Sequence, residues 1–342
     1  MSDLAADVDR CERGLAMQLE RMATPAEMLD LDLQPAEVEG PSAGTRPAVM
    51  LLDGRRRRFF FKAAEPILVA GEVFAYGVRR LARRPTIPVV ARSCEVPGIG
   101  EALGMMQPFV EHLPGRLDAD AAVWSDLQRE AMMREHPWEW LLANFDTHVD
   151  QYVFMGEQHY PLNVDWDHAL MDLDIVTLDR FTKRLPAIAP LRNMLYDAYV
   201  HGRVRVHFGG MRREMRRIAR LDRATLIELV DAYTGFLGMA PEQAARVRQQ
   251  FLERRRHLTR VFEHFIAALR AERYSRRGGR ALSAPEHAAR AIHAVQDGWQ
   301  RLVVGTLHDR VLGPIFRAYR GVLARRVRRD GAARRAAARP VE

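Results

Sequence analysis

The sequence predicts an α+β protein in which a small, mainly-β part precedes a larger, mainly-α part. Within residues 48–62, two short apolar runs flank Asp53-Gly54. This is a strong hairpin signal, because the dipeptide readily takes the positive φ angles of a type I′ turn. After residue 176, apolar residues recur at every third or fourth position in nearly every segment. That period is typical of α-helices, so the two kinds of structure are expected to separate along the chain.

The first part is predicted to contain a helix (3–22), a long loop (24–47), the hairpin (48–62), a second helix (71–84) and two strands (87–92 and 102–110). The second helix carries basic residues at its C-terminal end, where they complement the helix dipole. The second part is predicted to contain a helix (121–143), a polar turn (144–149), two short strands (152–155 and 162–164) and, beyond residue 176, helices only.

Composition indicates a globular protein with a substantial core, since 48% of the 342 residues are hydrophobic. Cys11 and Cys94 are the only cysteines, too few for a disulfide framework or a cysteine metal site. The apolar stretches are short and interrupted by charge, so no membrane span is expected. The acidic, amphipathic N-terminal segment does not resemble a secretory signal. We therefore expect a cytoplasmic protein.

The net charge of +8 is concentrated beyond residue 202, where arginine is abundant. Such charge could attract nucleic acid or an anionic membrane. The aromatic residues of this region lie with the apolar face rather than among the arginines, so no base-stacking platform is visible. Solvated helix faces with i,i+4 ion pairs explain the charge more simply. Nucleic-acid binding is therefore not favoured.

Lysine is rare, because only Lys62 and Lys183 occur among 52 basic residues. Arginine would serve equally well on most solvated surfaces, so a retained lysine suggests a compact ammonium in a confined place. Lys62 ends the second hairpin strand, and Glu72 lies in the helix that follows. A strand lysine held by a helix glutamate directs an ammonium at the α- and β-phosphates of ATP. The alternative is a pair of ordinary, solvated side chains.

Carboxylates and an amide occur in two later turns. Asp146 lies in the polar segment LLANFDTHVDQYVF, where it could face a substrate hydroxyl, and Gln151 could offer an amide oxygen to a metal. Asp165 follows an apolar strand 19 residues after Asp146. Such a set suits Mg²⁺, which prefers one or two carboxylates together with phosphate oxygens. The alternative is that these residues form turns, and that Asp165 and Asp167 cap a helix.

Four segments, in the same order and at similar spacing, resemble the HipA-like kinases and the related phosphatidylinositol kinases: SAGTRPAVMLLDGRRRRFFFK, EVFAYGVRRLARRPTIPVV, NFDTHVDQ and NVDWDHAL. The resemblance covers residues 40–175 and implies a bilobal protein-kinase-like fold. Together with the sequence pattern outside this range, it predicts four parts. These are an N-terminal helix and linker (1–40), an N-lobe (41–111), a C-lobe (112–280) and a C-terminal helix with an Arg-rich tail (281–342).

The resemblance also implies roles for individual residues. Lys62 would contact the phosphates of ATP and be oriented by Glu72. Asp146 would be the catalytic carboxylate, His148 would support its loop, and Asp165 would bind Mg²⁺ together with Gln151. Further ATP contacts would come from a phosphate loop and from the adenine-binding hinge at 106–110, through Ser42, Gly44, Arg46, Gln107 and Phe109. The acceptor implied is a hydroxyl group, with protein Ser or Thr favoured.

This sequence departs from the family pattern at three places. Gln151 stands where the family has a metal-binding Asn, Thr147 replaces an Arg, and the phosphate loop holds a single glycine. These changes leave open a pseudokinase that acts as a binding module. A small-molecule or inositol-lipid kinase is the alternative among enzymes.

A second register is also conceivable, because His148-Val149-Asp150 and Val164-Asp165-Trp166 resemble motifs of aminoglycoside phosphotransferases. In that register the metal-binding Asn would fall at Met155, which cannot bind Mg²⁺. The register with Asp146 and Gln151 is therefore favoured.

Overall fold

The computed structural model describes residues 2–35, 47–96, 99–144, 149–170, 190 and 193–276. All of them belong to the first of two compact units, Met1–Leu282 and Ser283–Glu342. Several residues with expected roles lie outside the described ranges: Ser42, Gly44, Arg46, Asp146, Thr147 and His148. The predicted last helix and Arg-rich tail also lie outside them.

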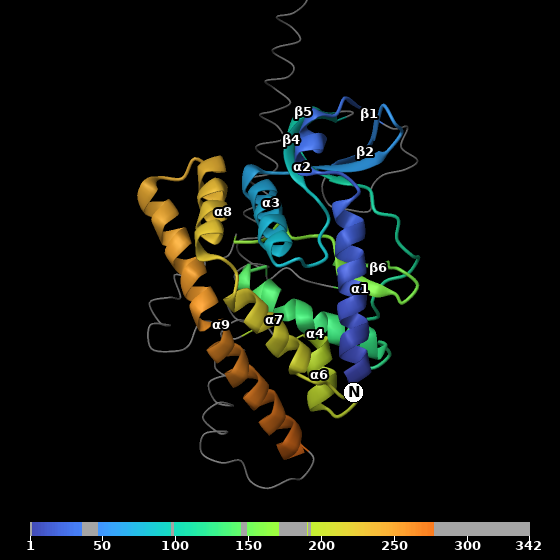
Figure 1. Ribbon diagram of the computed structural model, residues 1–342, viewed down its shortest axis with the longest axis vertical. Coiled ribbons are helices and arrows are strands. Elements are labelled where there is room, and N and C mark those ends of the chain that lie inside the picture. The colour runs from blue at the N-terminus through green and yellow to red at the C-terminus, as the bar shows by residue number, and fades with distance from the viewer. Residues whose placement is uncertain are drawn as a thin grey trace, which may run out of the picture. The chain divides into compact units, whose positions relative to one another are not determined.

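A five-stranded antiparallel sheet forms the β part, with strand order β1-β2-β3-β5-β4 (Figure 1). The strands are β1 (Leu33–Pro35), β2 (Ala48–Asp53), β3 (Arg58–Ala63), β4 (Val90–Val96) and β5 (Gly100–Pro108). Helix α3 (Pro66–Leu81) connects β3 to β4. Side chains alternate across the sheet, so Phe59 and Phe61 of β3 enter an apolar cluster while Lys62 takes the opposite face.

The predicted hairpin is confirmed, but its turn is not of type I′. The left-handed residue is Arg56, with φ of 62°, and Gly54 has no positive φ. The carboxylate of Asp53 accepts hydrogen bonds from the backbone N–H groups of Arg55 and Arg57 at 2.9 and 2.8 Å. An aspartate side chain therefore organises a longer turn, in the way that Asx motifs do.

Part of the long loop predicted at 24–47 is regular structure, so that prediction was wrong there. Helix α2 (Pro25–Asp30) begins with a capping box, in which Thr24 and Glu27 exchange side-chain and backbone hydrogen bonds. The Thr-x-x-Glu spacing is a sequence signal for such a start. Strand β1 is a three-residue edge strand that pairs with β2. It gains its structure from that pairing rather than from a strong local pattern.

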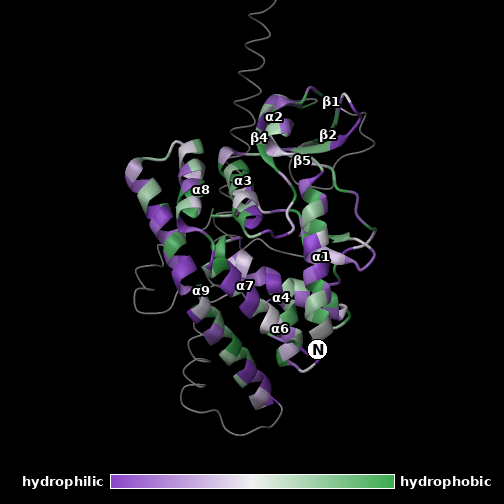
Figure 2. Ribbon diagram, in the orientation of Figure 1, coloured by the Kyte–Doolittle hydropathy of each residue, from purple (hydrophilic) through white to green (hydrophobic). Residues whose placement is uncertain are grey.

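The larger part is mainly helical, with α1 (Ser2–Glu20), α4 (Asp126–Leu141), α6 (Met194–Val200), α7 (Gly209–Ala219), α8 (Arg223–Phe236) and α9 (Pro241–Arg276). A short hairpin of β6 (Tyr152–Met155) and β7 (Tyr160–Asn163) follows a 3₁₀ turn at Val149–Gln151. Hydrophilic residues recur along α9 between hydrophobic ones (Figure 2). No helix within the described ranges is long and apolar enough to cross a membrane.

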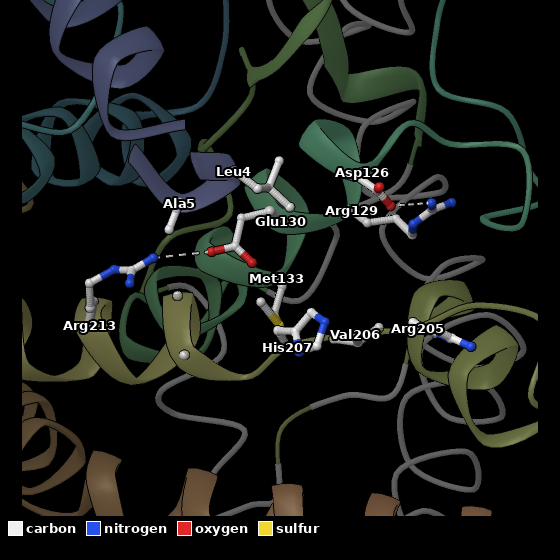
Figure 3. A pocket seen from close by; sticks show the side chains of 12 residues that line it. Leu4, Ala5, Asp126, Arg129, Glu130, Met133, Arg205, Val206, His207 and Arg213 are labelled. Atoms are coloured by element: carbon white, nitrogen blue, oxygen red, sulfur yellow. Dashed lines mark hydrogen bonds and ion pairs between the residues drawn. The ribbon is translucent and has the colours of Figure 1, made fainter. Parts of the chain in front are cut away.

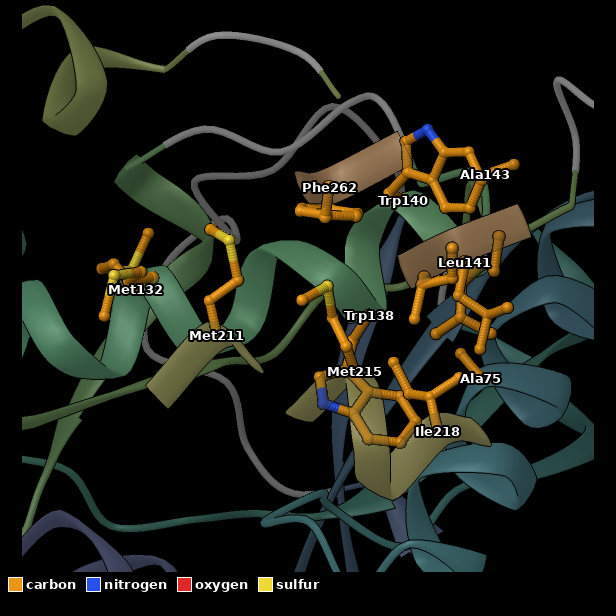
Figure 4. Close-up of a cluster of buried hydrophobic side chains, with 14 of the residues drawn as sticks. Ala75, Met132, Trp138, Trp140, Leu141, Ala143, Met211, Met215, Ile218 and Phe262 are labelled. Carbon is orange, nitrogen blue, oxygen red and sulfur yellow. The ribbon is translucent and has the colours of Figure 1, made fainter. Parts of the chain in front are cut away.

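The main core lies where α3, α4, α7, α8 and α9 meet. Met215 and Ile218 of α7 lie beside Trp138 of α4, and Met211 lies further along α7 toward Met132 (Figure 4). The rings of Trp140 and Phe262 meet edge-on, with centroids 5.9 Å apart. This core fixes α3 against the helical part of the chain.

Charged side chains are buried next to this core. Arg84, which follows α3, is 0% exposed and pairs with Glu12 of α1 and Glu135 of α4, both at 2.6 Å. Arg134 of α4 is also 0% exposed and pairs with Glu130 at 2.9 Å. The network therefore joins α1 to the end of α3 and to α4.

Glu139 of α4 is a buried acid without a basic ion-pair partner among the described residues. Burial raises its pKa to about 8, although the hydroxyl of Tyr152 donates a hydrogen bond to Oε1 at 2.6 Å and works in the opposite direction. The side chain should therefore carry a proton at neutral pH in the folded protein. Its contribution to stability is present below the ordinary pKa of 4.5 and is lost as the pH rises through about 8.

Replacing Glu139 with Gln should remove this pH dependence, because a neutral amide keeps an acceptor for Tyr152 and cannot ionise. One pKa unit corresponds to about 1.4 kcal/mol. Between pH 5 and pH 8 we expect the wild type to lose on the order of 3 kcal/mol of unfolding free energy relative to Glu139→Gln. Urea unfolding of both proteins at the two pH values measures the difference. Parallel pH profiles would contradict a protonated Glu139.

Candidate active site

Lys62 makes the central ion pairs of the candidate site. Its Nζ donates hydrogen bonds to both carboxylate oxygens of Asp165 at 3.2 Å and to Oδ2 of Asp167 at 3.0 Å. The side chain of Lys62 is 20% exposed, that of Asp165 27% and that of Asp167 3%. A strand of the sheet and the segment after β7 thus meet through one ammonium and two carboxylates.

The segment that carries the aspartates is held by two asparagines. Oδ1 of Asn163 accepts a hydrogen bond from the backbone N–H of Asp165 at 2.9 Å. Nδ2 of Asn144 donates to the carbonyl oxygen of Asp165 at 3.5 Å. Both asparagines are buried. The backbone of Asp165 is therefore fixed from both sides.

Helix α3 approaches the same segment closely. Glu72, the residue expected to orient Lys62, accepts a hydrogen bond from the backbone N–H of Trp166 at 2.7 Å. A Cβ atom on the preceding residue, Gly71, would lie only 2.7 Å from the carbonyl oxygen of Asp167 and 2.8 Å from that of Ala169. Glycine is thus required for this approach. Glu72 acts on the segment that carries the two carboxylates.

Three carboxylates surround one ammonium in this cluster. Burial, followed by the charges of Asp165 and Asp167, raises the pKa of Glu72 well above its ordinary value, while Lys62 lowers it. Burial and the charge of Asp167 likewise raise the pKa of Asp165, against the effect of Lys62. Negative charge is therefore in excess here, and a further cation would offset both burial and mutual repulsion.

This donor set fits Mg²⁺, which binds through one or two carboxylates and completes its shell with phosphate oxygens and water. Among the described residues, no three His, Cys, Asp or Glu side chains are grouped so as to hold a metal ion by themselves. Asp165 and Asp167 would be the protein ligands, and nucleotide phosphates would be needed to complete the site.

The described residues on either side of Asp146 lie close to Asp165. Asn144, at the start of NFDTHVDQ, contacts Asp165 as described above. At the other end, the backbone carbonyl of Gln151 accepts a hydrogen bond from the N–H of Val164 at 3.0 Å, and Gln151 is buried. The structure therefore brings Lys62, Glu72 and Asp165 together. Gln151 is connected to them by its backbone bond to Val164, the residue before Asp165.

Gln107 and Phe109, expected to contact adenine, lie at the end of β5 and just beyond it. Gln107 pairs with Phe60 in the register of β3 and β5. The backbone N–H of Phe109 donates to the carbonyl of Arg58 at 2.8 Å, and the Arg58 guanidinium lies 4.4 Å from the centre of the Phe109 ring. The N–H of Phe109 is thus already bonded within the sheet.

The second register receives no support from the positions of its residues. Asp150 pairs with Arg116 at 2.6 Å, and both side chains are more than half exposed. Met155 is buried among apolar residues that include Val8 and Leu15. A buried thioether in an apolar cluster offers no ligand to Mg²⁺.

Asp167, Trp166 and Asn144 also belong to the site, although no role in it was expected of them from the sequence. The Asp-x-Asp spacing was a usable signal, because residues two apart in extended backbone point to the same side. Asn144 begins a quoted motif. Trp166 also lies within a quoted motif, but its contacts with α3 could not be inferred from sequence spacing.

A cavity of about 490 Å³ lies elsewhere, between the first turn of α1, the start of α4 and residues 205–213 (Figure 3). None of its lining residues belongs to the Lys62 cluster. Two of its arginines are already paired, Arg129 with Asp126 at 2.6 Å and Arg213 with Glu130 at 3.4 Å. Ion pairs between lining residues therefore neutralise much of the positive charge around the cavity.

Comparisons with known proteins give similarities in structure only. No protein-family model matches the chain, and no curated protein matches it in sequence. The proinflammatory kinase CtkA of Helicobacter pylori is similar with a TM-score of 0.45 and 11% identity, over 69% of this chain and 98% of that one. The Golgi casein kinase is similar with a TM-score of 0.38 and 11% identity, over 74% of this chain and 75% of that one. Because both TM-scores lie below 0.5, we argue the function from the residues of the site.

Proposed function

We propose that this chain is an ATP-dependent phosphotransferase that moves the γ-phosphate of ATP to a hydroxyl group, with Ser or Thr of a protein as the acceptor. The observation that carries the proposal is the contact of Lys62 with Asp165 and Asp167 beside α3. Phosphoryl transfer needs a cation for the phosphates, carboxylates for a metal and a carboxylate near the attacking hydroxyl. The first two requirements have candidates in this cluster. The resemblance to HipA-like kinases supports the choice of acceptor.

Each residue has one task in this proposal. Lys62 directs its ammonium toward the phosphate oxygens of the nucleotide. Asp165 and Asp167 would hold Mg²⁺, which when bound would offset the negative charge of the nucleotide phosphates. Glu72 keeps the backbone between the two aspartates in place. Asp146, in the loop between Asn144 and Gln151, positions the acceptor hydroxyl and takes its proton.

Replacing Lys62 with Arg should lower turnover about a hundredfold, the size of effect expected for one group of a preorganised electrostatic site. The charge is kept, but a planar guanidinium cannot occupy the place of a compact ammonium that contacts three oxygen atoms. The assay follows label from γ-labelled ATP into the full chain and into candidate acceptors, with Mg²⁺ or Mn²⁺.

Lys183→Arg is the matched control, because it exchanges the other lysine of the chain, and it should retain turnover. Label in Ser or Thr of an added protein supports the proposal. Label only in an alcohol of a small molecule or an inositol lipid would move the acceptor to that class. If the wild type neither binds nucleotide nor transfers label, the proposal that the chain is a kinase is refuted.

A further inference from the structure

The side chain of Trp166 is covered by an arginine of α3. The guanidinium carbon of Arg79 lies 4.3 Å from the centre of the Trp166 ring. Arg79 is 1% exposed and Trp166 is 2% exposed, so the contact is removed from water. Cation–π contacts are strongest when desolvated in this way. The residue held by this contact stands between Asp165 and Asp167.

Helix α3 therefore contacts Trp166 at two points. Glu72 binds its backbone N–H, and Arg79, seven residues further along the helix, stacks on its ring. Residues seven apart lie two turns apart on the same face of a helix. Backbone and side chain of Trp166 are thus held by one rigid element.

Arg79 is itself fixed in place. Its guanidinium pairs with Glu135 of α4, and Nη2 donates to the carbonyl oxygen of Pro85 at 2.9 Å. Burial alone would raise the pKa of Glu135, but Arg79 and Arg84 lower it, so the pair stays ionised. The position of the Trp166 ring is thereby linked to α4.

We propose that Arg79 is a positioning residue of the active site: by stacking on Trp166, it fixes the segment that presents Asp165 and Asp167 to Lys62. What the two aspartates do there rests on the proposed function. Arg79 does not touch the reacting groups. Without the stacking, helix α3 would hold Trp166 only through Glu72, and the carboxylates would spend less time at Lys62.

Amide hydrogen exchange of the full chain tests the proposal without requiring catalysis. In Arg79→Lys the charge and an ion-pair donor to Glu135 remain, but the planar group is lost. We expect the amide of Trp166 to exchange about tenfold faster, because the planar guanidinium stacks on the ring, whereas a lysine ammonium can lie over the ring but does not stack on it. Arg80→Lys is the matched control, since Arg80 is the adjacent, exposed residue of α3, and it should leave exchange unchanged.

A second variant protects the test against misfolding. Trp166→Leu removes the ring but keeps an apolar side chain, and residues 163–167 should exchange faster in it. Combining it with Arg79→Lys should add nothing further in that segment. Unchanged exchange in Arg79→Lys, or an additive effect in the double variant, would overturn the proposal.

Measurements of turnover distinguish a failure of the positioning role of Arg79 from a failure of the proposed kinase function. If the chain is a kinase, Arg79→Lys should raise the Mg²⁺ concentration for half-maximal turnover severalfold, with a smaller change in the KM for a protein acceptor. An unchanged Mg²⁺ requirement in an active enzyme would count against a positioning role. If the wild type has no turnover, the proposed function fails, while the exchange comparison still decides whether Arg79 holds the segment.

Discussion

Replacing Asp165 with Asn should lower kcat/KM for ATP by about a thousandfold, the upper range for one electrostatic group in a preorganised site. The change removes a metal charge and the carboxylate that accepts two hydrogen bonds from Lys62. ATP affinity should fall only when Mg²⁺ is present, because the lost group acts through the metal. Titration of ATP binding with and without Mg²⁺, together with turnover, measures both effects.

Two comparisons make this result specific. Asp150→Asn removes an exposed carboxylate that pairs with Arg116 and should retain turnover. Asp146→Asn should keep ATP binding and mainly lower kcat, because its proposed role belongs to the transition state. Equal and harmless outcomes at Asp165 and Asp146 would mean that the cluster is not a kinase site.

Replacing Arg84 with Met should lower the free energy of unfolding by about 3–5 kcal/mol, the cost of breaking a buried ion pair from one side. Arg84 is 0% exposed and pairs with Glu12 and Glu135, with Glu214 at 3.7 Å. Methionine replaces the aliphatic part of the arginine side chain but leaves these buried carboxylates without their common cation. Urea unfolding at constant pH measures the loss.

The exposed residue Arg80 provides the control, since Arg80→Met should change stability by less than about 0.5 kcal/mol. A double variant provides a second check. Glu12→Met combined with Arg84→Met should recover part of the loss, because replacing both members of a buried pair with apolar groups costs less than removing one. An Arg84→Met protein as stable as the wild type would show that the network contributes little.

The sequence predicted those helices and strands whose formation depends mainly on nearby residues. The hairpin around Asp53, the helix around Glu72 and the strands on either side of residue 157 were recognised from alternation and turn residues. Strand β1 was missed, because a three-residue edge strand exists only through its pairing with β2. The turn type was wrong, because the side chain of Asp53 binds two backbone N–H groups that dipeptide preference does not consider.

The candidate site could be predicted as a set of residue types but not as a set of contacts. The scarcity of lysine identified Lys62, and strand-end placement identified Asp165. The sequence could not show that Glu72 acts on the backbone of Trp166, because backbone partners leave no residue-type signal. Asp167 was considered only in the alternative interpretation, in which it caps a helix together with Asp165.

Because lysine is rare in this chain, the proposed site can be labelled selectively at Lys62. Lys62 and Lys183 carry its two ε-amines, and the side chain of Lys62 is one-fifth exposed and bound to two carboxylates. An acylating reagent attached to a nucleotide would therefore find one ε-amine at the proposed site and one other along the chain. Peptide mapping after such labelling would read the occupancy of this site with almost no background from the 50 arginines, which such reagents leave untouched.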